Sequence, residues 1–471
     1  MTGRQLLALS PLIILAASSV LVMLCIAFAR SHLVTVCLTC GALVLACVSL
    51  WWVPRPVRLT ALLVADGYSL FYLLLILASC TVVGVLSYRY LSVREGNREE
   101  YYLLLLFVAF GAAVIVSSGH FASFFLGLEI LSVAFYALIG YLRGSPAGLE
   151  GAVKYLILAA VSDAFLLFGI AALYARSGTM EFSVHACVLK GGIGILDLAG
   201  IAMFLTGIGF KLSLVPFHMW TPDVYQGAPA PVTALIATVS KGAVLAFLLK
   251  YALETDSLGS MASFLGAVAF ASMAVGNLLA LMQDNVKRIL AYSSIAHFGY
   301  VLVAFLAGGE LALNAVGYYL VAYFVTTLGA FGVLIALSGA DRELDRLDDY
   351  RGLIWERPWQ AAVFAVMLLS LAGIPLTAGF VGKLYVILGG VGSGLWVLVA
   401  GLVVASLVGI YYYLRIVAVM FGERPEPIPD YAGGSVAEHL VLAGLLALVL
   451  WLGLYPSSLI GIMERTVAGS G

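Results

Sequence analysis

Long apolar segments recur along the whole chain and dominate its pattern of hydrophobic and polar positions. They centre near residues 17, 42, 78, 110, 131, 163, 207, 241, 271, 299, 325, 373, 407 and 449. Each is about 20 residues long, the length with which an α-helix crosses the hydrocarbon core of a bilayer. Alternating strands of about ten residues, typical of an outer-membrane barrel, do not occur. The pattern predicts an all-α polytopic membrane protein with about 14 transmembrane helices.

Composition supports this prediction and excludes several classes of function. Hydrophobic residues make up 63% of the 471 residues and charged residues 10%, which a water-soluble domain of this length could not accommodate. No basic cluster suggests a nucleic-acid partner, and neither a phosphate-binding loop nor a dinucleotide fingerprint occurs. Cys37 and Cys40 have C-x-x-C spacing, but they lie in an apolar segment without a second pair. We interpret them as core residues, and we expect no metal and no cofactor in this chain.

The distribution of basic residues predicts the orientation in the membrane. With 14 spans, one side holds both termini and seven basic residues: Arg4, Arg55, Arg58, Arg176, Lys190, Lys250 and Arg465. The other side holds thirteen: Arg30, Arg89, Arg94, Arg98, Arg143, Lys287, Arg288, Arg342, Arg346, Arg351, Arg357, Arg415 and Arg424. Basic loops stay in the cytoplasm, so both termini are predicted to be periplasmic.

The four remaining basic residues, Lys154, Lys211, Lys241 and Lys383, fall inside apolar spans. A lysine at the centre of a lipid-facing helix costs about 2.5–3.5 kcal/mol, so we expect all four to face a protein interior or a wet cavity. None is an arginine, and a desolvated lysine can lose its proton whereas arginine cannot. The alternative is a set of static lysine–carboxylate pairs that fix the register of the helices.

Two further ionisable residues lie inside spans. Glu129 is followed by Ser132 and Tyr136, which would form a polar stripe along one helix face. His297 follows Ser293 and Ser294 by about one turn. A proton-relay role and a satisfied core histidine are both open for His297.

Helix-breaking residues accompany two of the lysines. Lys211 and His218 are seven residues apart, which would place them on one helix stripe, and Pro216 interrupts that stripe. Lys383 follows the stretch GIPLTAGFVG. Such breaks are tolerated in a membrane only where protein or water satisfies the freed backbone groups.

The spacing of these residues indicates an internal repeat. Glu129 and Lys211 are 82 residues apart, and His297 and Lys383 are 86 apart. Equivalent positions would be separated by five spans, an odd number, so the second unit would be inverted relative to the first. Paired, interrupted spans in two halves are typical of inverted-repeat transporters.

Three stretches of the sequence carry a resemblance to a known family: GFKLSLVPFHMWTPDVYQGAPAPVTALIATVSK, KRILAYSSIAHFGY and MLLSLAGIPLTAGFVGKLYV. They closely resemble the subunit N family of bacterial respiratory complex I, the proton-pumping NADH:quinone oxidoreductase. The likeness extends from DGYSLFYLLLILAS near residue 66 to VGIYYYLRI near residue 415. The TPDVYQGAPAP run separates this family from its two sister antiporter-like subunits and from multisubunit sodium/proton antiporters.

The resemblance implies a fold of two inverted five-helix repeats with discontinuous helices 7 and 12. It places N-terminal helices 1–3 at residues 1–95 and the first repeat, helices 4–8, at 100–255. The second repeat, helices 9–13, falls at 260–421, and helix 14 at 435–471.

The resemblance also implies a relay of polar residues through the membrane. Its members are Glu129 of the fifth helix, Lys154 of the sixth, Lys211 at the broken seventh, Lys241 of the eighth, His297 of the tenth and Lys383 of the twelfth. We add His218 to this relay because its spacing would place it on one stripe with Lys211. Glu129 could pair with Lys211 or with Lys154. His297 would lie between Lys241 and Lys383.

Asp163 is not a feature that the resemblance implies. It lies nine residues from Lys154, nearly opposite on the same helix, so the two should not pair. We interpret Asp163 as a structural polar contact to a neighbouring helix.

The function implied is proton translocation coupled to NADH:quinone oxidoreduction in a bacterial inner membrane. The chain would have no redox site, and FMN, iron–sulfur clusters and quinone would belong to the rest of the complex. Its partners would be the lipid bilayer and other membrane-arm subunits, including the sister antiporter-like subunits. A free-standing cation/proton antiporter and a purely structural membrane-arm subunit are the alternatives.

The predicted orientation can be tested with reporter fusions. A reporter fused after Arg357 should report the cytoplasm, because the loop before it belongs to the more basic side. A reporter at the C-terminus should report the periplasm. The reverse pair of results would contradict the orientation, and the same result at both sites would contradict the three spans predicted after Arg357.

Overall fold

The structure is a computed structural model that describes residues 3–54, 57–94, 96–182, 194–255, 262–340, 342–423 and 434–468. Three of the basic residues counted for orientation, Arg55, Lys190 and Arg424, lie outside these residues. The described elements are α1 (Gly3–Ala8), α2 (Ser10–Phe28), α3 (His32–Ser49), η1 (Leu50–Trp52), β1 (Val57–Arg58), β2 (Val64–Ala65), α4 (Gly67–Ser92), α5 (Glu99–Val116), α6 (Phe121–Ile139), α7 (Pro146–Ser177), α9 (Ile195–Lys211), α10 (Trp220–Gly227), α11 (Ala230–Leu235), η2 (Ile236–Ser240), α12 (Lys241–Thr255), α13 (Ala262–Leu281), α14 (Val286–Ala307), α15 (Gly309–Leu337), η4 (Leu347–Tyr350), α16 (Leu353–Glu356), α17 (Pro358–Ala372), α18 (Ala378–Gly392), α19 (Trp396–Met420), α20 (Val436–Leu454) and α21 (Ser457–Ala468).

Apolar helices account for all of the predicted spans. Among the described residues, twelve helices are long and apolar enough to cross a membrane. The two other spans are interrupted, one between α9 and α10 and one between α17 and α18. The eighth span is one continuous helical run, Ala230–Glu254, composed of α11, a π-helical segment and α12. The prediction of a multi-pass helical membrane protein with broken seventh and twelfth helices is confirmed.

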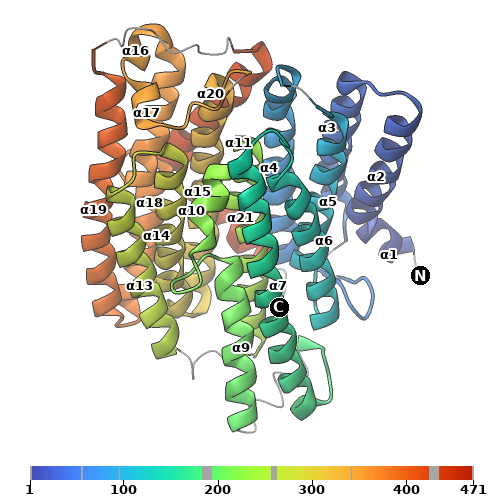
Figure 1. The fold of residues 1–471 in the computed structure, drawn as a ribbon. Coiled ribbons are helices and arrows are strands. Elements are labelled where there is room, and N and C mark those ends of the chain that lie inside the picture. The colour runs from blue at the N-terminus through green and yellow to red at the C-terminus, as the bar shows by residue number, and fades with distance from the viewer. Residues whose placement is uncertain are drawn as a thin grey trace.

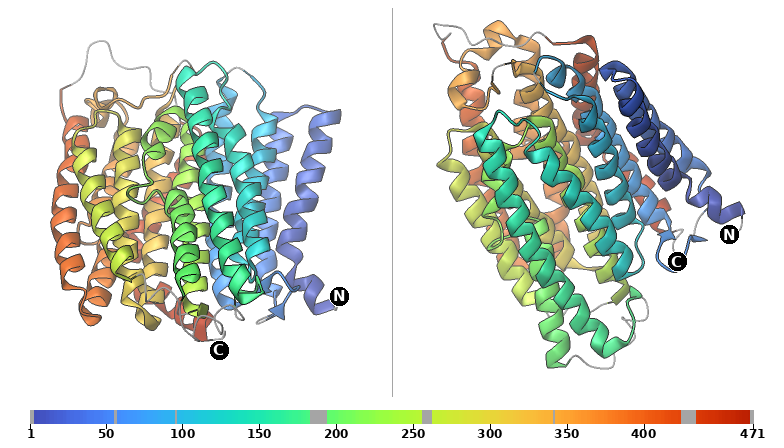
Figure 2. Two further views of the ribbon diagram at one scale, coloured as in Figure 1. Left: turned by 60° about the horizontal axis from the view of Figure 1, so that its bottom comes forward. Right: turned by 45° about the vertical axis from the view of Figure 1, so that its right-hand side comes forward.

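The helices stand side by side in one elongated bundle, with α2 and α3 at one edge and α19 at the other (Figure 1). Both chain termini lie at the same end of the bundle (Figure 2), as an even number of spans requires. The most buried spans lie in the middle: Ala230–Glu254 is 100% buried over its most apolar window and α15 94%, whereas α2 is only 28% buried. The interior of the bundle is therefore protein-lined, and its rim faces lipid.

Glycines allow two helices next to the interior to approach closely. A Cβ on Gly111 of α5 would lie 2.8 Å from the carbonyl oxygen of Gly127 in α6. A Cβ on Gly127 would in turn lie 2.9 Å from the carbonyl oxygen of Gly111. Small residues at such crossings let helix backbones pack in membranes, where association relies on close van der Waals contact. This contact fixes α6, which carries Glu129 two residues further along.

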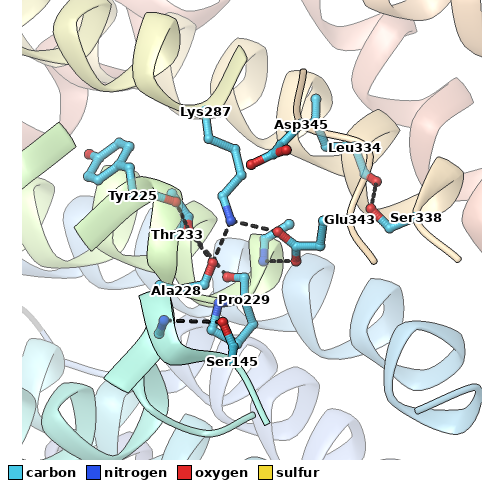
Figure 3. A network of polar contacts seen from close by, with 12 residues as sticks. Ser145, Tyr225, Ala228, Pro229, Thr233, Lys287, Leu334, Ser338, Glu343 and Asp345 are labelled. Carbon is cyan, nitrogen blue, oxygen red and sulfur yellow. Dashed lines mark hydrogen bonds and ion pairs between the residues drawn. The ribbon is translucent and has the colours of Figure 1, made fainter. Parts of the chain in front are cut away.

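A buried ion pair contacts the backbone at the start of α11 (Figure 3). Lys287, at the start of α14, donates hydrogen bonds of 2.6 Å to the Glu343 carboxylate and 2.6 Å to the Ala228 carbonyl oxygen. Glu343 also accepts a 2.7 Å hydrogen bond from the backbone N–H of Ala230 and one from the Tyr90 hydroxyl. The pair thus ties the start of α11 in the first half to α14 in the second.

The charges of this pair are shielded from solvent. The side chain of Lys287 is 1% exposed and that of Glu343 is 17% exposed. Burial alone would raise the pKa of Glu343, but the Lys287 ammonium and the hydrogen bonds outweigh it and hold that pKa below its usual range. The carboxylate is therefore charged at neutral pH, and the stability that the pair contributes is lost only as the pH falls through this lowered pKa.

Lys287→Met should destabilise the assembled complex by about 3–5 kcal/mol, because it leaves the Glu343 carboxylate buried without its cation. The double variant Lys287→Met/Glu343→Gln should recover a large part of that loss, since both charges are then absent. The control is Arg351→Ala, which removes a 3.8 Å pair with Asp348 whose side chains are 56% and 88% exposed; it should change stability by no more than about 1 kcal/mol. The measurement is the thermal stability and yield of the purified complex. Equal losses of stability in the single and double variants would contradict a stabilising role of the Lys287–Glu343 ion pair.

Candidate functional site

Protein groups satisfy the backbone at the first helix interruption. Helix α9 ends at Lys211, and residues 212–219 form turns before α10 begins. The Trp220 indole donates a 3.1 Å hydrogen bond to the carbonyl oxygen of Phe210, the residue before Lys211. The N–H of Val215 donates to the Ser272 hydroxyl at 3.0 Å. Polar partners from the fold thus replace the missing helical hydrogen bonds, as a break at membrane depth requires.

The helical register assumed between Lys211 and His218 is wrong. The two residues share no helix, because α9 ends at Lys211 and His218 lies in the turns that follow. Pro216 does not kink a continuing helix but sits within this connection. The His218 side chain is nonetheless buried, at 7% exposure.

Lys211 lies in a cluster of polar groups from three helices. Its ammonium nitrogen is 2.8 Å from Oδ1 of Asp163 and donates to Oδ2 at 3.0 Å. It also donates a 3.1 Å hydrogen bond to the hydroxyl of Ser132 on α6. Lys211 is 3% exposed and Asp163 5%. The direct carboxylate partner of Lys211 is therefore Asp163, which the sequence analysis treated only as a structural contact.

Glu129 stands beside this cluster and is partly buried. Its carboxyl group lies close enough to Asp163 and Lys211 to feel the charges of both. Of the two partners considered for Glu129, Lys154 pairs with Glu150 and Asp223 and Lys211 pairs with Asp163, so Glu129 forms an ion pair with neither lysine in the described structure. As predicted, Asp163 does not pair with Lys154.

Lys154 does not face the protein interior, contrary to expectation. Its side chain is 41% exposed, and its ammonium nitrogen forms 2.7 Å ion pairs with Glu150 and with Asp223 of α10. The periodicity of α7 alone could not show which face is covered. The carboxylates of Glu150 and Asp223 remove most of the cost of the charge at this position.

Lys241 is the most deeply buried of the predicted lysines, at 0% exposure. Its ammonium nitrogen donates a 2.8 Å hydrogen bond to the Ser294 hydroxyl of α14. It lies 5.4 Å from the ring centre of Tyr225 and 5.2 Å from that of Phe298, within cation–π range. The π-helical segment η2 ends directly before Lys241, and such segments frequently mark functional sites.

His297 is 5% exposed and contacts two phenol groups rather than Ser293 directly. Its Nδ1 lies 2.6 Å from the Tyr319 hydroxyl, and its Nε2 lies 3.1 Å from the Tyr413 hydroxyl. Tyr413 in turn hydrogen-bonds Ser293. The histidine therefore has a polar partner on each ring nitrogen, and either could exchange a proton with it.

A tyrosine of α15 connects His297 to Lys241. The Tyr323 hydroxyl donates a 2.8 Å hydrogen bond to Ser294, the residue that holds Lys241. The Tyr323 ring centre lies 5.5 Å from that of His297. Lys241, Ser294, Tyr323 and His297 thus form one contiguous group across α12, α14 and α15.

Lys383 reaches back to the second helix interruption. Its ammonium nitrogen donates to the carbonyl oxygen of Ala372, the last residue of α17, at 2.7 Å, and to the Ser406 hydroxyl of α19 at 2.8 Å. The negative end of the α17 dipole therefore faces this cation. The Tyr300 ring lies 5.4 Å from the ammonium nitrogen and 5.5 Å from the His297 ring, so it is a neighbour of both.

Glycines make the second interruption compact. A Cβ on Gly379 would lie 1.8 Å from the carbonyl oxygen of Ser370, and one on Gly373 would lie 2.9 Å from the Lys383 side chain. Gly373 also has a φ of +86°, which a glycine adopts without strain.

The two broken spans are not equivalent in register, contrary to the spacing argument. Lys211 precedes its interruption as the last residue of α9, whereas Lys383 follows its interruption inside α18. The residue five positions before Pro375 is Ser370, where Lys211 stands five before Pro216. Each lysine lies beside a break, but on opposite sides of it along the chain.

Sequence reasoning also missed buried lysines at the ends of spans. Lys250 was assigned to a loop, yet it is 6% exposed and forms a 3.0 Å ion pair with Asp66, which caps the start of α4. Lys287 was assigned to the opposite loops and is buried against Glu343. Lys250 was counted on the side with seven basic residues and Lys287 on the side with thirteen. Removing one residue from each side leaves the difference between the two sides unchanged. Lone hydroxyl groups in apolar spans have no distinctive sequence pattern. The sequence therefore did not show the contacts made by the hydroxyl groups of Ser294, Tyr319, Tyr323, Tyr413 and Ser406.

The described lysines fall into two groups by their partners. Four have a carboxylate within ion-pair distance: Lys154, Lys211, Lys250 and Lys287. Across the described residues, Lys241 and Lys383 have none, and their ammonium groups contact hydroxyl and carbonyl oxygens instead. Hydrogen bonds connect Lys241 to Tyr323 through Ser294, whereas Tyr323 and His297 are in contact only through their rings. The hydroxyl, imidazole and amino groups gathered here are of the kinds that accept and donate protons.

Curated relatives are similar to this chain over nearly its whole length. NADH-quinone oxidoreductase subunit N of Nitrosospira multiformis is 49% identical, covering 99% of this chain and 97% of its own length. The subunit N proteins of Chromohalobacter salexigens and Ectopseudomonas mendocina are 47% and 45% identical, covering 99% and 98% of this chain and 100% and 97% of their own lengths.

Solved structures share the fold. A chain of respiratory complex I from Thermus thermophilus with bound aureothin superposes with a TM-score of 0.84 at 35% identity, over 96% of this chain and 98% of that chain. A chain of the Mrp complex from Dietzia superposes with a TM-score of 0.88 over 99% and 97%, but at 22% identity it shows the fold alone.

The family model described as NADH:quinone oxidoreductase/Mrp antiporter, transmembrane, matches residues 118–409, which include α6 through most of α19. The predicted relay residues and both interruptions lie within this range, whereas Tyr413, a partner of His297, lies just beyond it. Together with relatives that match over nearly their whole length, this places the chain in the subunit N family of NADH-quinone oxidoreductases, within the NADH:quinone oxidoreductase/Mrp antiporter family.

Proposed function

We propose that this chain is a proton-translocating membrane subunit of an NADH:quinone oxidoreductase and that its buried polar residues carry the protons. The observation that carries the relay is the pair of buried lysines without a carboxylate partner. Lys241 is 0% exposed and Lys383 7%, and the partners of both are neutral oxygen atoms. An ammonium group held in this way is poorly compensated, so it can give up its proton near neutral pH.

The two unpaired lysines differ in how well their charge is stabilised. Lys241 has one hydroxyl and two aromatic rings, contacts that are worth about 0.5–2 kcal/mol each. Lys383 additionally faces the carbonyl end of α17, which contributes up to about 2 kcal/mol in a buried setting. A proton would therefore pass from Lys241 through His297 to the more stabilised Lys383.

The order of the relay follows the contacts. We place Glu129, Asp163 and Lys211 at one end, then Lys241, Ser294, Tyr323 and His297, and Lys383 beyond Tyr300. His218, buried in the first interruption, stays a candidate beside Lys211. Lys154 is the weakest candidate for the relay, because its side chain is partly exposed and its ammonium group pairs with two carboxylates. Gaps without direct hydrogen bonds are to be bridged by water.

Electron transfer is assigned to other subunits of the complex. In this proposal FMN, the iron–sulfur clusters and quinone bind elsewhere, and this chain supplies no redox group. Its partners are other membrane-arm subunits, including antiporter-like ones, in line with the complexes from which its structural relatives come. A conformational or electrostatic signal from those neighbours drives the proton movement.

The membrane and the orientation are also proposals. We assign the chain to a bacterial inner membrane with both termini periplasmic, on the basis of its basic-residue asymmetry. We further propose the division into residues 1–95, 100–255, 260–421 and 435–471, with the two five-helix repeats as the middle units. The Lys287–Glu343 pair then lies at the junction of the repeats.

The two alternatives make different predictions. A free-standing cation/proton antiporter would be active when purified as a single chain, whereas relatives at 45–49% identity carry the name of an oxidoreductase subunit. A purely structural subunit would tolerate loss of its unpaired lysines. Structural lysines would be expected to have carboxylate partners, as Lys250 and Lys287 do.

Lys241→Ala should lower coupled NADH:quinone turnover and proton translocation at least tenfold while the complex still assembles, because loss of a proton-transfer group typically costs about 10²–10⁴-fold. Lys241→Arg should not restore activity, since guanidinium keeps its proton. Lys154→Ala, at an exposed and carboxylate-paired lysine, should cost much less. The assays are NADH:quinone turnover and proton uptake in membrane vesicles, normalised to assembled complex, and full proton translocation in Lys241→Ala would contradict the relay.

A further inference from the structure

We propose that a cavity at one end of the bundle binds the headgroup of an anionic phospholipid of the phosphatidylglycerol type. The cavity has a volume of about 690 Å³ and opens where α4 and α6 end and where α5 and α7 begin. This volume is within the range of small-molecule sites. None of the residues placed in the proton relay lines the cavity, so the inference does not depend on the proposed function.

A buried guanidinium group without a full set of partners lies in the wall of this cavity. Arg94 is 7% exposed, and its Cζ lies 3.6 Å from the centre of the Tyr90 ring. Its Nη1 donates a 2.7 Å hydrogen bond to the carbonyl oxygen of Tyr90, whereas its Nη2 has no hydrogen-bond partner among the described residues. A buried donor that lacks an acceptor is costly, and an anionic oxygen in the cavity would remove that cost.

Two further arginines line the same cavity. Arg98 donates a 3.1 Å hydrogen bond to the carbonyl oxygen of Arg94, and Arg143 is exposed. In the part of the chain that the structure describes, none of the three arginines has a carboxylate within ion-pair distance, whereas Arg288 and Arg342 do have one. The planar guanidinium group matches the geometry of phosphate oxygens, so three uncompensated arginines favour a phosphate-bearing ligand.

The cavity also contains a hydrogen-bond acceptor without a partner. Oε1 of Glu100 forms a 2.5 Å ion pair with Arg30, which compensates its charge, but the buried Oε2 has no hydrogen-bond partner among the described residues. A ligand that satisfies both groups must offer an acceptor to Arg94 and a donor to Glu100. The phosphate and the glycerol hydroxyls of phosphatidylglycerol supply both. The ammonium of phosphatidylethanolamine would also donate, but that headgroup has no net charge to match the arginines.

A neighbouring cavity is less suited to an anion. It has a volume of about 1040 Å³ and shares Arg94 and Arg143 with the first cavity. Its wall contains four arginines and four carboxylates, so no excess of positive charge remains. These are Arg94, Arg143, Arg342, Arg346, Glu343, Asp345, Asp348 and Asp349. The first cavity contains three arginines and only one carboxylate, which Arg30 already pairs. An anion is therefore drawn to the first cavity.

The surroundings of the cavity favour a lipid over a free phosphate ion. Leu149 of α7 lines the cavity, and Leu149, Val153 and Leu156 are exposed. Their spacing places them on one helix face, which runs from the cavity along α7. An acyl chain attached to the bound headgroup would follow this apolar stripe. Basic pockets between transmembrane helices bind anionic headgroups in this manner.

The test uses photoactivatable lipids on the intact complex, reconstituted into phosphatidylcholine vesicles. Each sample contains one tracer, which is a phosphatidylglycerol, a phosphatidylethanolamine or a phosphatidylcholine with a diazirine in one acyl chain. After illumination, mass spectrometry measures the labelling of peptides that contain Leu149, Val153 and Leu156. The phosphatidylglycerol tracer should label them at least about fivefold more than the other two, because the attraction of one arginine for an anionic headgroup corresponds to about a fivefold change in occupancy.

Variants identify the arginines that hold the headgroup. Arg94→Gln and Arg143→Gln should each lower labelling by the phosphatidylglycerol tracer about fivefold. Arg143 is exposed, so its variant keeps the test decisive if loss of the buried Arg94 prevents assembly. The control is Arg351→Gln, which removes an exposed arginine outside the cavity and should leave the labelling unchanged.

Four outcomes would overturn the proposal. Equal labelling by the three tracers would mean that only ordinary boundary lipid reaches α7. No labelling by any tracer would mean that a neighbouring subunit covers the cavity. Labelling that survives both variants would place the headgroup elsewhere. Displacement of the phosphatidylglycerol tracer by inorganic phosphate, beyond the effect of sodium chloride at equal ionic strength, would indicate a site for a free anion.

Discussion

An ammonium group inside a membrane protein is costly unless a carboxylate compensates it, and this constraint organises the interior of the bundle. Lys211, Lys250 and Lys287 each have a buried or half-buried carboxylate within 3.0 Å. These pairs join segments that are distant in the chain, and Lys287 and Glu343 also hold the backbone at the start of α11. Lys241 and Lys383 are the exceptions among the described lysines, and exceptions of this kind mark functional sites in membranes.

One of the two helix interruptions supplies a partner for an unpaired lysine. A broken helix exposes carbonyl and N–H groups that must find partners inside the protein. At the second interruption Lys383 itself donates to the freed carbonyl of Ala372, so the break and the lysine stabilise each other. At the first, Trp220 and Ser272 satisfy the backbone and leave the Lys211 ammonium to Asp163. Lys383 therefore has neutral partners beside its helix interruption, whereas Lys211 has a carboxylate partner beside its own.

The sequence was sufficient to predict the fold and the depth of most charges. Apolar runs located fourteen spans, and their prolines located both interruptions. The burial of Lys211, Lys241, His297 and Lys383 followed from their positions inside spans. The exposure of Lys154 could not be predicted, because a helix in a bundle has one face towards protein and another towards lipid or the rim, and both are apolar in this chain.

Pairing between helices was the main information that the sequence lacked. Asp163 and Lys211 are 48 residues apart, and Lys287 and Glu343 are 56 apart, so no local pattern joins them. The register between Lys211 and His218 failed for a different reason: helical spacing has meaning only within one helix. Tyrosine hydroxyls that contact His297 could not be distinguished from the many tyrosines that only fill the core.

We propose that protons cross this chain along one continuous hydrated axis from Lys211 through Lys241 and His297 to Lys383. The most direct measurement is a cryo-electron microscopy map of the intact complex at a resolution that shows ordered water. Such an axis requires water molecules at hydrogen-bonding distance, about 2.7–3.2 Å, between Lys211 and Lys241. It also requires them near the Tyr300 ring, between His297 and Lys383. A dry, apolar gap at either place, in every state of the working complex, would contradict it.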